Sequence, residues 1–339
     1  MSTPTLRDVA ARAGVHPSTA SRALNPETRS LVNVGTLRRV DAAAASLGYK
    51  PNAIARSLRT RRTSTVGMVI PDLTNPIFPP TVRGVEDGLA QFGYTVLLAN
   101  TDNDDAREER DFDVLRSRQV DGLIIATATH NTPIARLTAD ASLPMVFLYD
   151  VVDGIEAHSV VIDNAMGTRK AVAHVRSLGH QDIAYIAGPQ DRSPAVERLH
   201  AFRQEMGAGL NEDLIRISPA FSEDEGAEAF RSLLDSDHPF TAVLTASDLL
   251  ALGVYDVTTE RALSCPDDFS LVGFHDVSFV DKLSPGLTTI RVPHHQVGVE
   301  ASRLLLEQLR EGESYPIQIR VPVQLVQRGS TAPVGRNRS

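Results

Sequence analysis

Residues 5–25 read TLRDVAARAGVHPSTASRALN, and this stretch decides the fold of the amino-terminal part of the chain. Its apolar residues between positions 6 and 13 share one face of a helix. Gly14 stands where a chain leaving that helix needs a left-handed residue. A second short helix follows, with Pro17 in its first turn and Asn25-Pro26 at its end. The pattern predicts a helix-turn-helix, whose second helix can lie in the major groove of DNA.

Charge is divided unequally along the chain. Residues 1–62 hold 11 Lys and Arg against 3 Asp and Glu, whereas residues 63–339 hold 23 against 39. A basic head on an acidic body is typical of a soluble nucleic-acid binder with a separate regulatory part. The alternative is a basic disordered tail on an acidic enzyme. We favour a folded head, because its apolar residues are periodic and it contains no low-complexity run.

The residues after the second helix complete the head and lead out of it. Residues 34–47 predict a third helix, with Asn33 as its cap and Gly48 at its end. The connector that follows contains Asn52 as a cap candidate. Residues 52–58 have room for only about two turns of helix, which is too short to be stable alone.

From Thr65 onward the chain alternates buried strands and amphipathic helices. This alternation implies open, doubly wound parallel sheets, and about 270 residues are too many for one such sheet. We therefore expect an α/β body of two subdomains with a cleft between them. The expected strands lie near residues 66–70, 95–99, 122–126, 145–148, 159–162, 183–187, 214–217, 242–245, 270–274 and 317–323. The expected helices include residues 81–92, 107–118, 165–178, 196–206, 225–234, 248–260 and 297–309.

Composition and missing motifs limit the possible functions. Cys265 is the one cysteine, so an intramolecular disulfide is excluded. We find no secretory signal and no window of eighteen apolar residues, which predicts a cytoplasmic protein without a membrane partner. The sequence has no Walker loop, nucleophile elbow or HExxH motif, and His294-His295 lacks metal-ligand spacing. We expect no enzyme, cofactor or metal site, and we interpret Asp102–Asp105 as a solvated acidic loop.

Motifs spread over about 280 residues resemble the lactose/galactose-repressor (LacI/GalR) family of bacterial transcription regulators. Each motif alone is weak, but their order along the chain is specific. They are LRDVA (residues 6–10), GV (14–15), STASRALN (18–25), LGYKPN (47–52), ARSL (55–58), DLTNP (72–76), DG (121–122), IDN (162–164), GH (179–180), GP (188–189) with Arg198, Asp248 with Ala251 and Gly253, and Pro285 with LTT (287–289).

The resemblance implies a body like that of periplasmic sugar-binding proteins, with crossovers near residues 162–163, 290–293 and 321–323. It places a helix-turn-helix head at residues 1–50, a hinge helix and linker at 51–64, and an effector-binding and dimerisation body at 65–335. Within the body, the N-subdomain would comprise about residues 65–162 and 292–322. The C-subdomain would comprise about residues 163–291 and 323–335.

The resemblance also assigns DNA contacts. Pro17, Ser18 and Arg22 match the family's base-reading positions, and a guanidinium can bond two acceptors of guanine. A phosphate contact is the less favoured alternative for Arg22. His16 departs from the small hydroxyl residue usual there, and could cap the second helix poorly yet touch a phosphate. The other contacts expected in the head are Thr5, Thr19, Ser21, Asn25 and Tyr49.

Leu58 is the most specific residue of the connector. In this family the connector helix folds on operator DNA, and a pair of leucines from a dimer wedges into the minor groove. A solvent-exposed linker leucine is the alternative, which we disfavour because basic residues flank Leu58 on both sides. The contacts expected from the connector are Asn52, Ala55, Arg56, Leu58 and Arg59.

The resemblance places a small-molecule effector in the cleft of the body. Arg198 matches the family's ligand-clamping arginine, with a surface ion pair to Glu205 or Glu228 as the alternative. His275 replaces the usual hydroxyl-binding carboxylate, and Tyr149 replaces a common aspartate. We therefore expect a sugar or sugar derivative as the effector, and keep an anionic metabolite or a nucleoside as alternatives. The expected effector contacts are Asp72, Asn75, Phe78, Tyr149, Arg192, Arg198, Phe221, Asp248 and His275.

Together these features predict a ligand-responsive repressor that binds double-stranded operator DNA as a homodimer. One small head makes too few contacts for strong specificity, so two heads are needed. A solute-binding transport protein would share the body but lack the head. A doubly wound metabolic enzyme would need a catalytic constellation that the sequence does not show.

Overall fold

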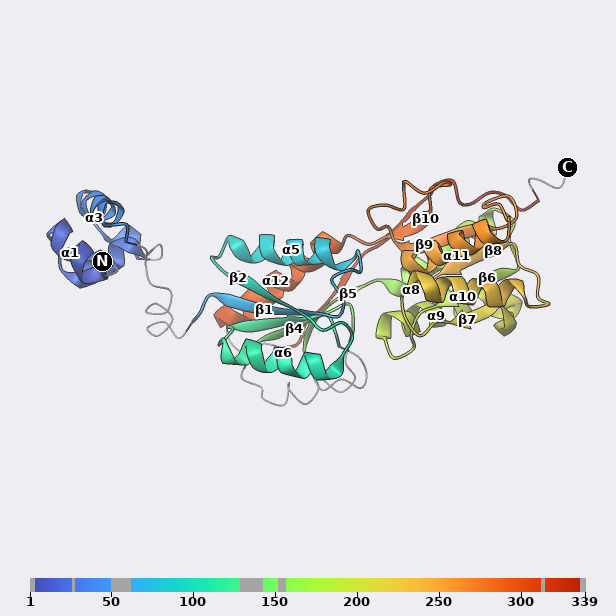
Figure 1. The fold of residues 1–339 in the computed structure, drawn as a ribbon, viewed down its shortest axis with the longest axis horizontal. Coiled ribbons are helices and arrows are strands. Elements are labelled where there is room, and N and C mark those ends of the chain that lie inside the picture. The colour runs from blue at the N-terminus through green and yellow to red at the C-terminus, as the bar shows by residue number, and fades with distance from the viewer. Residues whose placement is uncertain are drawn as a thin grey trace. The chain divides into compact units, whose positions relative to one another are not determined.

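The computed structural model describes residues 4–25, 28–49, 62–128, 143–151, 157–311 and 315–335. The chain divides into two compact units, Met1–Thr63 and Ser64–Ser339, which we call the head and the body (Figure 1). Within the described residues, no helix is both long enough and apolar enough to cross a membrane.

The head is a small helical unit built around alanine and valine. Small side chains let its short helices approach closely, and the predicted helix-turn-helix is present. The first helix begins at a capping box of Thr5 and Asp8 and ends at Gly14, whose φ is 65°. The described elements are α1 (Leu6–Ala13), α2 (Pro17–Leu24), the 3-10 helix η1 (Arg29–Leu31) and α3 (Val34–Leu47). The buried core is formed by Val9, Ala10, Ala13, Ala20, Ala23, Val40, Ala43 and Ala44.

The first sheet of the body has the strand order β11-β5-β4-β3-β1-β2, and all its neighbours are parallel. Its strands are β1 (Thr65–Ile70), β2 (Thr95–Asn100), β3 (Gly122–Ile125), β4 (Met145–Leu148), β5 (His158–Ile162) and β11 (Gln318–Val321). The helices α5 (Phe78–Ala90), α6 (Asp105–Ser117) and α12 (His294–Glu311) pack on it. Most of its strands are buried as expected, but β2 is an edge strand whose Leu97 and Leu98 are 36% and 40% exposed.

The second sheet has the order β12-β10-β9-β8-β6-β7, parallel except for the β10–β12 pair. Its strands are β6 (Ile183–Ala187), β7 (Ile215–Ile217), β8 (Ala242–Thr245), β9 (Ser270–His275), β10 (Thr288–Arg291) and β12 (Gln324–Val326). Its helices are α8 (Asn164–Ser177), α9 (Ser193–Met206), α10 (Glu223–Leu234) and α11 (Asp248–Glu260), with short 3-10 turns η2 (Gly207–Gly209) and η3 (Glu212–Leu214). The expected architecture of two doubly wound sheets is confirmed.

The chain returns from the second sheet to the first through β10 and α12 (Figure 1). Helix α12 packs tightly against α5: a Cβ on Gly84 would lie 2.0 Å from the backbone oxygen of His295. A Cβ on Gly298 would lie 2.2 Å from the backbone oxygen of Thr81. Glycine is required at both positions, and this contact brings the start of α12 beside α5.

Two strands and several helix starts differ from the expectation. Residues 288–291, which overlap the expected crossover at 290–293, form β10, and residues 324–326, which follow the expected crossover at 321–323, form β12. The two strands pair with each other. Helix α12 begins at His294, three residues before the expected start; Pro293 precedes it, and a proline disfavours the helical conformation in the residue before it. Helix α5 likewise begins at Phe78 rather than residue 81, since the prolines after Phe78 fit a first turn.

Candidate functional site

The second helix of the head, α2, is the candidate DNA-recognition element. Ala20 and Ala23 are buried against the head core, whereas Ser18 and Arg22 are exposed. Ser18 and Arg22 are four residues apart, so they lie on one face of α2 and can reach the same groove. The other expected contacts on and beside this helix are half-buried: Pro17, Thr19, Ser21 and Asn25.

His16 is the N-cap residue of α2. Its Nδ1 accepts a hydrogen bond from the backbone nitrogen of Ser18 at 3.3 Å and lies 2.8 Å from Ser18 Oγ. An imidazole nitrogen thus takes the place of the hydroxyl oxygen that usually caps a helix. His16 does cap this helix, although the bond to the backbone is long.

Two further expected DNA contacts have structural roles in the head. The hydroxyl of Thr5 donates to Asp8 Oδ2 at 2.7 Å, and hydrogen bonds from the backbone and side chain of Thr5 lower the pKa of Asp8. Tyr49 packs against the head core. The DNA contacts of both residues stay predictions. The expected contacts Asn52, Ala55, Arg56, Leu58 and Arg59 lie outside the described residues.

Arg29 is a basic residue of the head whose charge is paired with Asp41 of the same unit. Its guanidinium donates to both carboxylate oxygens of Asp41 and to the backbone oxygen of Ala23 at 3.0 Å. These contacts tie the end of α2 to α3. Arg29 therefore supports the position of α2 rather than adding free positive charge.

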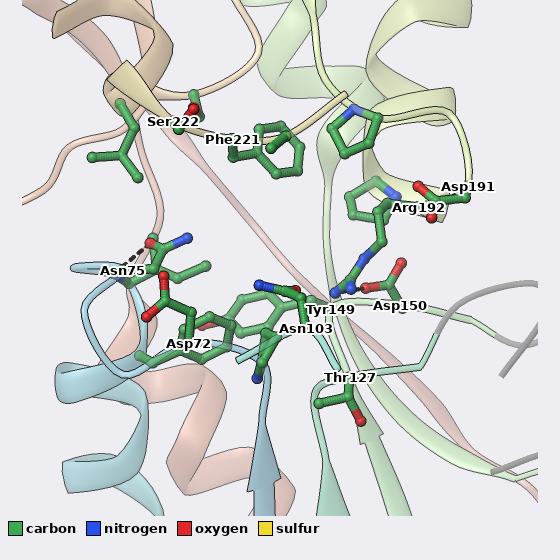
Figure 2. A pocket seen from close by; sticks show the side chains of 18 of the residues that line it. Asp72, Asn75, Asn103, Thr127, Tyr149, Asp150, Asp191, Arg192, Phe221 and Ser222 are labelled. Carbon is green, nitrogen blue, oxygen red and sulfur yellow. Dashed lines mark hydrogen bonds and ion pairs between the residues drawn. The ribbon is translucent and has the colours of Figure 1, made fainter. Parts of the chain in front are cut away.

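The body contains a cavity of about 590 Å³ between its two sheets. Loops at the carboxyl ends of strands from both sheets line it, which is where open α/β folds bind ligands. Figure 2 shows Asp72 and Asn75 on one side and Phe221, Ser222 and Arg192 on the other. All nine expected effector contacts line this one cavity: Asp72, Asn75, Phe78, Tyr149, Arg192, Arg198, Phe221, Asp248 and His275.

Arg198 lines the cavity but is only 2% exposed. Its guanidinium donates to Asn164 Oδ1 at 2.8 Å, to the backbone oxygen of Ala246, and to His275 Nε2 at 3.2 Å. The guanidinium carbon lies 3.9 Å from the centre of the Phe274 ring. Burial lowers the pKa of Arg198 to about 10, so it stays charged at neutral pH. The alternative of a surface ion pair with Glu205 or Glu228 was wrong.

Arg192 is the second arginine of the cavity, and its charge is matched by Asp150. Its Nη2 donates to Asp150 Oδ2 at 2.9 Å and to the backbone oxygen of Ala126 at 3.3 Å. Asp150 follows β4 of the first sheet, and Arg192 precedes α9 of the second. The pair therefore joins the two sides of the cavity, and Figure 2 shows the two side chains directed toward one another.

A buried chain of polar groups also links the two sides. Nδ1 of His294 lies 2.9 Å from the Tyr149 hydroxyl, which lies 2.5 Å from Thr81 Oγ1. The His294 ring stacks on His275 with ring centres 5.3 Å apart, and His275 in turn accepts from Arg198. Burial lowers the pKa of His294 to about 3 and that of His275 well below its ordinary value, so both are neutral at pH 7. His294, for which the sequence predicted no role, supports the cavity wall through Tyr149.

The carboxyl group of Asp248 is committed to the fold. Oδ1 accepts from Thr289 Oγ1 at 2.6 Å, and Oδ2 accepts from the backbone nitrogen of Val277 at 3.0 Å. Burial raises the pKa of Asp248 to about 7. Although Asp248 lines the cavity, it mainly fixes strand β10 to the turn after β9.

Sequence reasoning missed several polar residues of the cavity. Thr127 and Asp150 lie within two residues of the ends of β3 and β4, so the strand-end rule could have identified them. Asp104 caps α6 by accepting from the backbone nitrogen of Arg107 at 2.8 Å, and with Asp105 it lines the cavity, so the acidic loop is more than a solvated run. The missed polar side chains are Thr101, Asn103, Asp104, Asp105, Glu108, Thr127, Asp150, Asp191, Ser222 and Ser247. Among the described residues, no group of three His, Cys, Asp or Glu side chains is arranged to hold a metal ion.

A helix-turn-helix head joined to an α/β body with a ligand-sized cleft defines a DNA-binding regulator that senses a small molecule. Comparison with known proteins agrees. Residues 5–52 match the family described as bacterial regulatory proteins, lacI family, and residues 172–331 match a periplasmic binding protein-like domain. The ribose operon repressor of Escherichia coli strain K12 is 33% identical over 332 residues, covering 96% of this chain and 99% of that protein. The repressor CytR of the same strain is 32% identical over 337 residues, covering 96% of each.

Solved structures give the same result. The lac repressor dimer bound to operator and the anti-inducer ONPF has a TM-score of 0.86 at 29% identity, covering 98% of this chain and 100% of that one. A LacI family regulator from Enterococcus faecium with bound ribose has a TM-score of 0.70 at 32% identity, covering 80% and 99%. The chain therefore belongs to the lacI family of bacterial regulatory proteins. It is a transcription regulator rather than an enzyme.

Proposed function

We propose that this protein is a homodimeric repressor whose affinity for operator DNA is controlled by a neutral sugar, of which ribose is the first candidate. The observation that carries the proposal is the charge state of the cavity. Both of its arginines are already engaged, Arg192 by Asp150 and Arg198 by backbone and side-chain groups. An anionic effector would find Arg192 already paired with a carboxylate and Arg198 almost wholly enclosed.

The remaining groups of the cavity suit hydroxyls. Asp72, Asn75, Asn103 and Thr127 offer carboxylate, amide and hydroxyl groups that can exchange hydrogen bonds with a polyol. Phe221 offers a flat apolar face for a sugar ring. Gly188 leaves room for the Phe221 side chain, since a Cβ at position 188 would lie 2.2 Å from the Phe221 ring. Ribose is bound in the structure of the Enterococcus faecium regulator and names the operon of the Escherichia coli repressor.

The head supplies the operator contacts in this proposal. Ser18 and Arg22 contact bases, with Pro17 beside them, while the remaining residues position the head on phosphates and in the minor groove. The basic charge of residues 1–62 favours binding to any DNA duplex, and the base contacts of α2 add specificity for the operator sequence. The positioning residues are Thr5, His16, Thr19, Ser21, Asn25, Tyr49, Asn52, Ala55, Arg56, Leu58 and Arg59.

The domain limits and cellular location follow from the same proposal. The helix-turn-helix domain would comprise residues 1–50, the hinge helix and linker 51–64, and the effector-binding and dimerisation domain 65–335. Two copies would join through the body, where the exposed apolar side chains of Leu97 and Leu98 on edge strand β2 are surface that an interface would cover. Because its target is chromosomal DNA, the protein would act in the cytoplasm.

Calorimetric titration of the full-length protein tests the ligand. D-ribose should bind, whereas ribose 5-phosphate and gluconate should bind at least about tenfold more weakly. Tight binding of an anion together with no binding of any neutral sugar would contradict the proposal. Footprinting on a duplex selected by the protein from a random library should reveal a pseudo-palindromic site.

Substitution of Leu58 tests the hinge. Leu58→Ala should weaken binding to the operator while leaving sugar binding intact, because an apolar wedge acts only on the duplex. Leu31→Ala, which removes an exposed leucine of the head, is the control. Equal operator affinity of wild type and Leu58→Ala in a gel-shift titration would contradict the proposed insertion of Leu58 into the minor groove.

A further inference from the structure

Asp150 lines the cavity, and its carboxylate accepts three hydrogen bonds from the opposite side. Its Oδ2 accepts from Arg192 Nη2 at 2.9 Å. Its Oδ1 accepts from the backbone nitrogen of Ser193 at 3.0 Å and from Ser193 Oγ at 3.1 Å. The side chain of Asp150 is 1% exposed.

The donors around Asp150 are those of an anion site. Ser193 is the first residue of α9, a helix of 14 residues. The N-cap residue of this helix is Arg192, whose side chain makes no capping hydrogen bond. A helix N-terminus, a guanidinium and a hydroxyl together favour a phosphate or carboxylate. Here the protein's own carboxylate, contributed by the opposite sheet, satisfies all three.

The surrounding charge reinforces this arrangement. Glu108 is 3% exposed, lines the same cavity and interacts electrostatically with Arg192. Burial raises the pKa of Asp150, but the guanidinium and the two Ser193 donors favour its ionised form and oppose that rise. A second anion near Arg192 would therefore meet like charge rather than a counter-ion.

We propose that Asp150 is a specificity-determining residue: its carboxylate neutralises the anion-binding groups formed by Arg192 and the start of α9, and so restricts the effector to uncharged molecules. The proposal rests on the assignment of the cavity as the effector site. Asp150 acts through Arg192 and is a positioning residue, since nothing requires it to touch the sugar.

Asp150→Asn tests the proposal with little change in shape. The variant loses the carboxylate charge, leaving Arg192 and the N-terminus of α9 without an anionic partner. Affinity for ribose 5-phosphate and for inorganic phosphate, measured by calorimetry on the full chain, should rise by about tenfold or more. Affinity for D-ribose should change much less. Asp191→Asn is the matched control, since it removes an exposed carboxylate from the same cavity.

The possible results separate the two proposals. A gain of phosphate binding in Asp150→Asn but not in Asp191→Asn supports the role of Asp150. Equal gains in both variants, or no gain in a folded Asp150→Asn protein, would overturn it. Inorganic phosphate tests the anion site whatever the natural effector is, so failure of ribose to bind the wild type would count only against the proposed function.

A second variant covers the case in which Asp150→Asn does not fold. In Asp150→Ala, acetate or phosphate should take the place of the missing carboxylate and raise the thermal midpoint in a concentration-dependent way. The wild type should show no such rise. Equal responses of the two proteins to these anions would also overturn the proposal.

Discussion

The head and the cleft use arginine in opposite ways. Arg22 of the head is exposed on the face of α2 that is directed away from the core. Arg192 of the cleft is paired with the carboxylate of Asp150, and Arg198 is almost wholly buried and donates to neutral protein groups. The difference shows that an arginine in a binding region predicts an anionic partner only where its charge is left to solvent.

The largest expected effect comes from removing the buried arginine. Arg198→Met should lower the free energy of unfolding by about 3–5 kcal/mol, because Asn164 Oδ1 and the backbone oxygen of Ala246 lose their donor. Urea unfolding measures the change. Arg203→Met, which breaks an exposed pair with Glu212, should cost at most about 1 kcal/mol. Similar costs for the two variants would show that Arg198 is not the internal support described above.

An intermediate effect is expected for the exposed arginine. Arg22→Ala should weaken specific operator binding by about 1–3 kcal/mol and relax the preference at one base pair, without changing stability. Arg38→Ala removes the same charge from an exposed site on α3 and should weaken binding to all sequences alike. Fluorescence anisotropy on operator and scrambled duplexes distinguishes the two. A loss for Arg22→Ala that is equal on both duplexes would assign Arg22 to phosphate.

A smaller, pH-dependent effect is expected for Asp248. Its pKa is about 7 in the folded protein against an ordinary value of 3.8, so folding favours the protonated group. The protonated group therefore contributes to the free energy of unfolding. The contribution is fully present below the pKa of the unfolded chain and is lost as the pH rises through 7, by at most about 1.4 kcal/mol per pH unit. The stability advantage of wild type over Asp248→Asn should therefore shrink between pH 5 and about pH 7.5. A constant difference across that range in urea titrations would contradict the assigned pKa.

The smallest effect is expected at the cap of the recognition helix. His16→Ala removes the acceptor for the Ser18 amide and should destabilise the head by about 1 kcal/mol or less. His16→Ser, which supplies the usual hydroxyl cap, should restore or exceed the wild-type stability. Circular dichroism melting of the full chain would measure both, and a His16→Ser variant less stable than His16→Ala would show that the imidazole does not cap.

How much could be predicted from the sequence differs between the two regions for a physical reason. The head depends on contacts between near neighbours, so periodicity and caps predicted the third helix at 34–47 as observed. The cleft draws on strand ends spread from Asp72 to His275, and the family resemblance brought those residues together correctly. The Asp150–Arg192 pair and the burial of His294 arise from contacts between remote segments, which a single sequence does not show. Strands β10 and β12 were missed because segments of four and three residues carry too little pattern of their own.

The effect of D-ribose on operator affinity tests the central claim most directly. Fluorescence anisotropy of the full-length protein on its operator, with and without saturating ribose, measures the coupling between cleft and head. Ribose should change the operator affinity by about tenfold or more, a decrease identifying an inducer and an increase a corepressor. Affinity that is unchanged by ribose and other neutral sugars, yet altered by an anionic metabolite, would contradict that claim.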